Sequence, residues 1–257
     1  MADGSERQGG AAGSEAVAAQ IEFREPAVEG LVSCVVPVHD GERFLGEALD
    51  SVLEQTYEPL EIVVVDDGST DGTAEVAAGY GEAIRYFHQE NAGPSAARNR
   101  GVEASRGELI AFLDADDLWV PEKTATQVRA LRERPELDFC VGHIQNFWME
   151  ELAEEERWFS DREFSDPLPG YSLVTLLARR SVFEEVGGFD PDLGTGEDND
   201  WFLRARDRDV PHRMMPELLA RRRLHADNLT REDLASRDTL LRNLKASLDR
   251  RRGREGS

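Results

Sequence analysis

The fold of this chain can be read from one stretch of its sequence, Glu108-Leu109-Ile110-Ala111-Phe112-Leu113-Asp114-Ala115-Asp116-Asp117-Leu118-Trp119. Its apolar run, 109–113, predicts a parallel strand that is covered on both faces. Ligands of α/β proteins bind at the carboxyl ends of such strands, and this one ends in three carboxylates. Because crowded carboxylates repel one another, a divalent cation that bridges to phosphate oxygens is the simplest explanation. The alternative is an acidic helix cap before Pro121.

Strands and helices alternate around this stretch. Before it we predict strand 31–37, helix 44–53, strand 60–65, helix 73–78, strand 84–87 and helix 94–100. Pro121 is predicted to begin the helix that follows the stretch. This alternation predicts an α/β fold with a doubly wound, mainly parallel sheet, whose strand ends meet on one edge.

The pattern changes after Pro135. We predict strands at 137–141, 171–178 and 217–224, a short helix at 181–188 and an acidic helix start near 196–204. Residues 150–163 carry seven acidic and two basic side chains, which indicates a charged surface loop or, alternatively, a lid. The leucines of the last segment form one apolar helix face, which either packs on the domain or pairs with a second copy to give a homodimer: Leu234, Leu240, Leu241, Leu244 and Leu248.

Composition excludes several classes of function. The formal charge of −22 argues against nucleic acid or an anionic membrane as the main partner. Cys34 and Cys140 lie in apolar runs, as reduced, buried thiols do, which favours the cytoplasm. No run approaches the roughly 20 apolar residues of a membrane span. We therefore expect a cytoplasmic protein that is at most peripheral at the inner face of the membrane.

The charged motifs converge on one cleft if the predicted sheet forms. Acidic clusters end two strands, at 66–67 and 114–117, a basic helix start carries Arg98 and Arg100, and a third acidic motif lies at 196–200. A sugar nucleotide meets their requirements, because its diphosphate needs a cation and an acceptor hydroxyl needs a general base. The sequence has no Gly-x-x-x-x-Gly-Lys loop, dinucleotide glycine motif or Gly-x-Ser-x-Gly elbow, which disfavours P-loop enzymes, dehydrogenases and serine hydrolases.

Four motifs resemble those of the family 2 glycosyltransferases, which have the GT-A fold. In chain order they are Val65-Asp66-Asp67-Gly68-Ser69-Thr70-Asp71, Asn91-Ala92-Gly93-Pro94-Ser95-Ala96-Ala97-Arg98-Asn99, Phe112-Leu113-Asp114-Ala115-Asp116-Asp117 and Gly196-Glu197-Asp198. The resemblance covers roughly residues 30 to 230. It implies a Rossmann-like mixed sheet with an acceptor-side subregion and a terminal helix.

The resemblance also implies where the donor binds. Pro37, His39, Asp40 and Asp67 would form the nucleotide-base pocket, and Arg98 would lie near the base or the diphosphate. Asp40 stands where many relatives have Asn, which is a departure from the family pattern.

The same resemblance assigns a metal site and a base. Asp114 and Asp116 match the Asp-x-Asp pair, so Asp116 would hold Mg²⁺ or Mn²⁺ and Asp114 would lie near the ribose or the metal. Asp198, preceded by Glu197, matches the general base of an inverting reaction. His225 resembles a histidine near the metal and diphosphate. Asp200 lies two residues after Asp198, so spacing alone does not decide which carboxylate is the base.

The implied domain limits follow from these motifs. Residues 1–28 would form a disordered leader, 29–228 the GT-A domain with a nucleotide-binding half (29–135) and an acceptor half (136–228), and 229–257 an amphipathic helix with a basic tail. The expected activity is metal-dependent, inverting transfer from a nucleoside-diphosphate sugar, with a UDP-sugar favoured. The hydroxyl acceptor would be a glycan, glycolipid or other glycoconjugate, as in cell-envelope polysaccharide synthesis. The alternatives are a nucleotidyltransferase, which would need a glycine-rich basic loop after the first strand, and a sugar-nucleotide-binding scaffold without turnover.

Overall fold

The computed structural model describes residues 18–159, 166–193, 196–228, 243–248 and 250–251. Its strands are β1 (Val28–Val38), β2 (Leu60–Asp67), β3 (Arg85–Gln89), β4 (Gly107–Phe112), β5 (Leu118–Trp119), β6 (Phe139–Trp148), β7 (Leu168–Pro169), β8 (Leu177–Arg179) and β9 (His212–Leu224). The helices are α1 (Leu45–Leu53), α2 (Thr73–Ala78), α3 (Pro94–Ala104), α4 (Lys123–Glu133), α5 (Ala153–Phe159), α6 (Arg180–Val186) and α7 (Glu197–Asp207).

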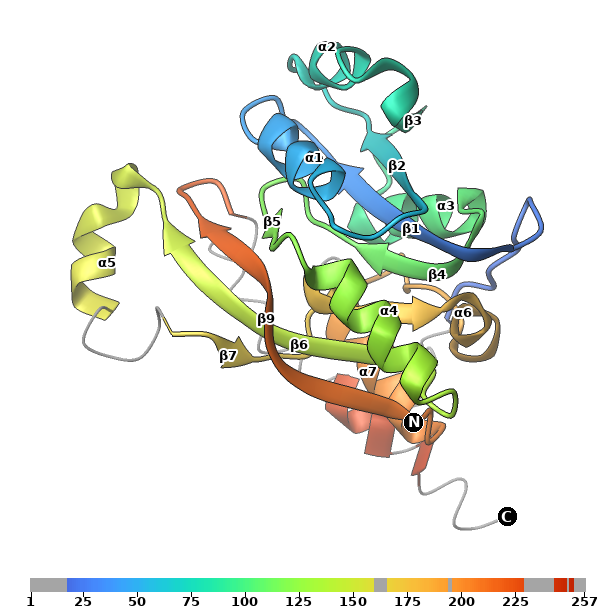
Figure 1. Ribbon diagram of the computed structural model, residues 1–257. Coiled ribbons are helices and arrows are strands. Elements are labelled where there is room, and N and C mark those ends of the chain that lie inside the picture. The colour runs from blue at the N-terminus through green and yellow to red at the C-terminus, as the bar shows by residue number, and fades with distance from the viewer. Residues whose placement is uncertain (1–17, 160–165, 194–195, 229–242, 249, 252–257) are drawn as a thin grey trace, which may run out of the picture.

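The strands form one mixed sheet in the order β3-β2-β1-β4-β8-β6-β9-β5, and β7 pairs with β6 (Figure 1). Strand β1 runs parallel to both β2 and β4, so the carboxyl ends of all three lie on the same edge. Beyond β4 the sheet changes character, because β8 is antiparallel to its neighbours β4 and β6. The predicted mixed α/β sheet is therefore confirmed, with its parallel part in the first half of the chain.

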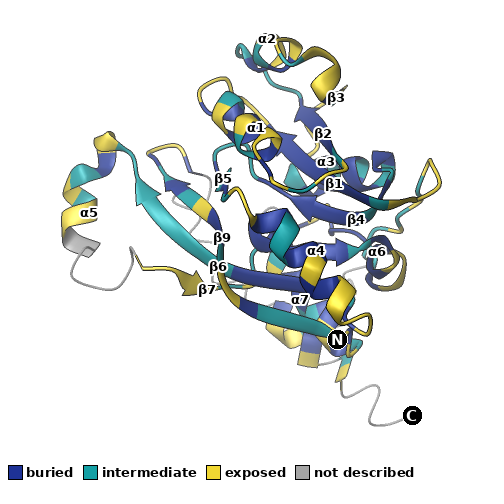
Figure 2. Cartoon of the chain, viewed as in Figure 1, coloured by how far each residue is buried: buried dark blue, intermediate teal, exposed yellow. Residues whose placement is uncertain are grey.

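Apolar cores fill both faces of the sheet. One face packs against α1 and α4, and the other against α3, α6 and α7. The second core is rich in aromatic rings, with Trp201 of α7 fully buried against Phe139 and Phe183. Figure 2 shows the central strands almost wholly buried, whereas α2, α5 and β7 lie at the exposed periphery. The covered strand β4 is what its apolar run predicts.

Close packing between α3 and β1 depends on one glycine. A Cβ atom at Gly101 would lie 2.3 Å from Cγ1 of Val35, a separation that side chains do not adopt. The absence of a side chain at Gly101 thus lets α3 approach the sheet, and α3 carries Arg98.

Residues 150–159 differ from the predicted charged loop. They form a short 3₁₀ turn (Glu150–Leu152) and α5, while residues 160–163 of the predicted loop lie outside the described residues. Arg43, just before α1, makes two hydrogen bonds to the Glu151 carboxylate, of 3.0 and 2.8 Å. The high density of charged residues predicted a solvated loop here. It gave no indication that Glu151 would pair with Arg43, more than 100 residues away.

The two ends of the described chain can be compared with the predicted leader and the predicted terminal helix. Residues 18–27, assigned to the leader, lie against the domain: Ile21 and Phe23 pack on the second core, and the Gly188 amide donates to the Ala19 carbonyl over 2.8 Å. Residues 1–17 and 229–242 lie outside the described part of the chain. Residues 243–248, 250 and 251 are helical, but Leu244 and Leu248 are 40% and 54% exposed rather than packed on the domain.

Two observations concern the environment of the protein. Within the described ranges, no helix has the length and apolar character that a membrane span requires. Cys34 and Cys140 are both buried free thiols, as their apolar surroundings predict.

Candidate functional site

The predicted acidic edge is built around a buried arginine. Arg98 projects from α3, and its guanidinium donates to Asp114, just after β4, over 2.7 Å and to Glu197, at the start of α7, over 2.5 Å. Burial alone would lower the pKa of Arg98, but the charges of Asp114 and Glu197 raise it above its usual value. One cation therefore joins two acidic motifs that are 83 residues apart in sequence.

Asp198 and Asp200 occupy different environments. Asp198 is only partly exposed to solvent. The partial burial of its carboxylate, together with the negative charge of Glu197, raises the pKa of Asp198 to about 6. Asp200 is 1% exposed and accepts a 2.7 Å hydrogen bond from Arg204, which also donates to carbonyls at the end of α6. Asp200 is thus enclosed and paired, whereas Asp198 is partly exposed, a distinction that the sequence left open.

Asp116 meets two side chains from the loop after β9. His225 Nε2 lies 3.0 Å from Asp116 Oδ2, and the Asn228 amide donates to the same oxygen over 3.1 Å. His225 is buried and packs on the Phe44 ring with centroids 4.8 Å apart, and its Nδ1 has no hydrogen-bond partner among the described residues. The predicted neighbourhood of Asp116 and His225 is therefore present in the fold.

Asp117 does not cap a helix. Helix α4 begins at Lys123 without a side-chain cap, and Asp117 Oδ1 accepts the Arg223 amide over 2.9 Å instead. Burial, together with the charges of Asp116 and Asp114, raises the pKa of Asp117 well above its usual value. The prediction of a helix cap at Asp117 is wrong, because its carboxylate accepts a hydrogen bond from the main chain of β9 instead.

Asp67 and Asp40 hold the loops of the predicted base pocket together. The Asp67 carboxylate accepts the Ala92 and Gly93 amides over 2.9 and 2.7 Å, which fixes the turn before α3. Asp40 has a φ of +48°, a conformation that Asp tolerates, and its carboxylate accepts the Thr70 amide over 2.7 Å. Both carboxylates thus fix the loops to which the base pocket is assigned by resemblance.

Pro37 and His39 complete this part of the site. Pro37 belongs to the buried end of β1, paired with Val65 of β2. The His39 ring is 43% exposed, and its Nδ1 lies 2.9 Å from the Asp67 carbonyl oxygen. His39 therefore offers an accessible aromatic ring at the predicted base pocket.

Sequence reasoning missed two residues of the site. Arg223 is sandwiched between the rings of Phe44 and Phe147 and donates to the Asp116 carbonyl over 2.9 Å. Asn228 contacts Asp116 as described above. Both lie within the run Arg222-Arg223-Leu224-His225-Ala226-Asp227-Asn228, so the proximity of His225 was the one available indication.

The described residues of the site do not form a complete metal cage by themselves. Among the described residues, no group of three His, Cys, Asp or Glu side chains is close enough to hold a metal ion. Mg²⁺ and Mn²⁺ are commonly held by one or two protein ligands and by substrate phosphates, so a full cage is not required. The Asp116 carboxylate, 3.0 Å from Nε2 of the buried His225, fits that arrangement.

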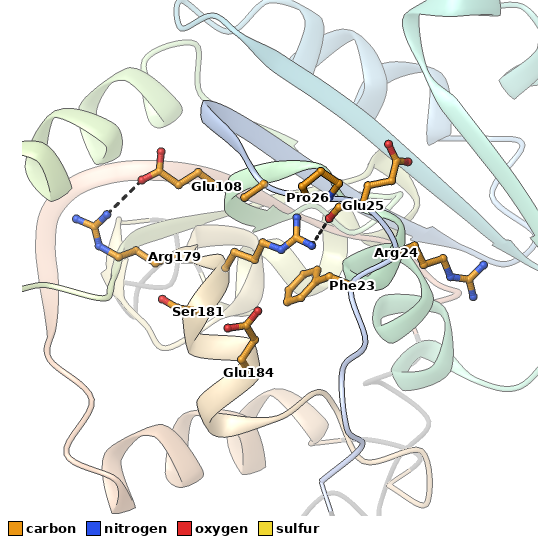
Figure 3. Close-up of a pocket in the computed structure, with 10 residues that line it drawn as sticks. Phe23, Arg24, Glu25, Pro26, Glu108, Arg179, Ser181 and Glu184 are labelled. Carbon is orange, nitrogen blue, oxygen red and sulfur yellow. Dashed lines mark hydrogen bonds and ion pairs between the residues drawn. The ribbon is translucent and has the colours of Figure 1, made fainter.

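A cavity of about 660 Å³ lies elsewhere, at the amino end of β4 (Figure 3). It is lined by residues 23–27, the start of α6 and Glu108, so it lies at the opposite end of β4 from Asp114. In its lining, Arg179 pairs with Glu108 at 3.6 Å, and Arg180 stacks on Phe23 and donates to the Glu25 carbonyl. This cavity is separate from the acidic site.

Comparison with known proteins shows to which family the chain belongs. The sequence profile of glycosyl transferase family 2 matches residues 33–187. The chain is 34% identical over 212 residues to an uncharacterised glycosyltransferase of Rickettsia typhi, covering 76% of this chain and 64% of that protein. It is 31% identical over 182 residues to glycosyltransferase GlyG of Streptococcus pneumoniae, covering 61% and 59%. The chain spans 34% to 66% of the lengths of the first four rickettsial glycosyltransferases that it matches.

Solved structures share the fold. S. aureus TarS 1-349 in complex with UDP-GlcNAc superposes with a TM-score of 0.68 at 18% identity, covering 85% of this chain and 66% of that one. The mannosyltransferase PcManGT of Pyrobaculum calidifontis, in complex with GDP-Man and Mn²⁺, gives 0.60 at 23% identity, covering 77% and 58%. The fold is the predicted GT-A fold. With the family profile matched over most of the domain, the chain belongs to glycosyl transferase family 2.

Proposed function

We propose that the protein transfers a sugar from a nucleoside-diphosphate sugar to a hydroxyl acceptor, with inversion at the anomeric carbon. The observation that carries this proposal is the ionic chain Asp114-Arg98-Glu197 beside the carboxylate of Asp198. It joins the end of the donor-side strand β4 to the start of α7, so a donor and a base are held in one frame. Such positioning of reactants is a large part of enzymatic rate enhancement.

Asp198 acts as the general base in this proposal. It takes the proton of the acceptor hydroxyl while the acceptor oxygen forms its bond to the anomeric carbon and the bond from that carbon to the diphosphate breaks. A base with a pKa of about 6 is largely ionised at neutral pH and still accepts a proton efficiently. Attack from the side opposite the leaving diphosphate inverts the configuration.

Asp116, His225 and Asp114 surround the place that we assign to the diphosphate. Asp116 and His225 would hold Mg²⁺ or Mn²⁺, which neutralises the charge of the departing nucleoside diphosphate when it is bound. Asn228 keeps the Asp116 carboxylate in place through its 3.1 Å hydrogen bond. The GT-A proteins in complex with UDP-GlcNAc, or with GDP-Man and Mn²⁺, support this substrate class.

The nucleotide pocket is assigned to the loops after β1 and β2. His39 contributes an accessible ring, while Asp40 and Asp67 hold the pocket loops in shape. We favour a UDP-sugar as the donor and a glycan, glycolipid or other glycoconjugate as the acceptor.

The proposal is tested by donor turnover. Purified protein is incubated with UDP-, GDP-, dTDP- and CDP-sugars, with and without Mn²⁺, and release of the nucleoside diphosphate is measured. We expect metal-dependent transfer or slow hydrolysis with one donor class, and its loss on Asp198→Asn with nucleotide binding retained. Undiminished turnover of Asp198→Asn refutes the base assignment. Tight nucleotide binding without turnover in any reaction indicates a binding scaffold instead.

A further inference from the structure

The helical residues 243–248, 250 and 251, here called the terminal helical segment, face α7 with polar side chains. Asn243 and Ser247 are 4% and 1% exposed, whereas Leu244 and Leu248 are 40% and 54% exposed. An amphipathic helix that packed for hydrophobic burial alone would turn its leucines inward. The contact with α7 therefore depends on specific hydrogen bonds.

These hydrogen bonds reach both ends of α7. At the first end, the Asn243 amide donates to the Gly196 carbonyl over 2.9 Å. At the other end, Asp207 accepts from Ser247 over 2.7 Å, from Arg250 over 2.9 Å and from Arg251 over 3.0 Å.

Asp207 is a strong anchor for the segment. Its side chain is only 3% exposed, and a buried carboxylate is costly unless it is paired and hydrogen-bonded. Burial would raise the pKa of Asp207, but the hydrogen bonds from Ser247, Arg250 and Arg251 hold it below its usual value. Removing the segment would leave this carboxylate buried without those donors.

The amino-terminal end of α7 carries the residues of the proposed site. Gly196 has a left-handed backbone with φ of +79°, and its carbonyl also accepts the Asp200 amide over 3.1 Å, which starts the helix. Glu197 and Asp198 follow Gly196 directly. The middle of α7 is held independently, because Trp201 is fully buried and donates to the Gly187 carbonyl over 3.0 Å. The core thus holds the middle of α7, whereas the Gly196 carbonyl at its start accepts hydrogen bonds from Asn243 and from the Asp200 amide.

We infer that Asn243 is a positioning residue for the transfer reaction: it holds the Gly196 peptide so that Glu197 and Asp198 keep their orientation toward Arg98 and the acceptor. This inference rests on the proposed role of Asp198 as the base. The terminal helical segment then serves the reaction through α7, without contacting the substrate. Asp207 fixes the segment, and Asn243 transmits that fixed position to the first turn of α7.

The test compares Asn243→Ala with Leu244→Ala, a matched change on the exposed side of the same segment. We expect Asn243→Ala to lower kcat by about tenfold to a hundredfold, as small misplacements of reacting groups do, with KM for the donor unchanged. Leu244→Ala should keep both values. Asn243→Gln retains an amide donor and should restore part of kcat, and Asn243→Asp, which keeps the size but loses the donor, replaces the alanine variant if that variant does not fold.

A second readout does not depend on activity. Exchange of the Asp200 amide hydrogen, measured by NMR, should become about fivefold faster in Asn243→Ala, the factor that corresponds to one average hydrogen bond, and should stay unchanged in Leu244→Ala. For an active wild type, an unchanged kcat in Asn243→Ala, or an equal loss in Leu244→Ala, overturns the inference. If the wild type shows no turnover, the proposed function fails, and unchanged exchange of Asp200 then overturns the contact as well.

Discussion

Lys123 provides a sharp test of the packing on which the site rests. It begins α4, is 0% exposed and has no carboxylate within ion-pair distance among the described residues. Its Nζ donates to Gln127 Oε1 over 2.8 Å and to the Leu176 carbonyl over 3.2 Å, and it lies 4.1 Å from the centre of the Trp119 ring. A neutral amine has two hydrogens, which match these two acceptors. Burial lowers the pKa of Lys123 from 10.5 to about 7.

The sign and size of the effect follow from linkage. Because the pKa of Lys123 is lower in the folded state, the unfolded chain binds its proton more readily, and the free energy of unfolding rises with pH from about 7 to about 10.5. The whole pKa difference corresponds to about 5 kcal/mol, of which about 2.5 kcal/mol falls between pH 6 and pH 9. Lys123→Met lacks this term. The stability of the variant relative to wild type should therefore fall by about 2.5 kcal/mol over that range.

Two measurements check this prediction. Urea unfolding at several pH values gives the difference between wild type and Lys123→Met, which cancels the titration of all shared groups; Lys245→Met, on the exposed side of the terminal helical segment, is the control. Lys123 and Lys245 are the chain's two lysines, so ¹³Cε-lysine NMR shows two signals that can be followed individually. The reasoning is refuted if the Lys123 signal titrates near pH 10 and the two stability curves run parallel.

The site and the core yield further predictions. The acid limb of kcat/KM should lie near pH 6, because Asp198 loses its function as a base when protonated; a flat profile from pH 4.5 to 7 would contradict this. Arg98→Met removes the cation that lowers the pKa of Asp198, so pH–rate measurements should show that limb at higher pH and a kcat reduced by at least about tenfold. Gly101→Ala should destabilise the fold by about 1–3 kcal/mol in urea unfolding, whereas Gly46→Ala in α1, whose added Cβ meets nothing closer than 3.6 Å, should be neutral or stabilising.

Much of the fold was predictable from local patterns. The helix over 73–78 coincides with α2, and the strands around 31–37, 60–65 and 109–113 differ from β1, β2 and β4 by a few residues at their ends. These elements are encoded by apolar periodicity and by turn residues close to them in sequence. The charged segment at 150–159 was predicted as a loop, but it forms a 3₁₀ turn and α5; Glu151 of that turn bonds Arg43, a contact that no local pattern reveals.

By itself the sequence determined the alternation of strands and helices, the acidic end of β4 and the family motifs, because each depends on residues that are neighbours along the chain. Only the tertiary structure decided which hydrogen-bond partners each carboxylate has. Asp198 and Asp200 are equivalent by spacing, but Arg204 takes Asp200 and leaves Asp198 open. Likewise, Asp117 accepts a hydrogen bond from the Arg223 amide of β9, and the Asn243 side chain donates one to the Gly196 carbonyl. Hydrogen-bond partners that lie far apart in sequence are chosen when the elements pack, and that choice separates a proposed base from a structural carboxylate.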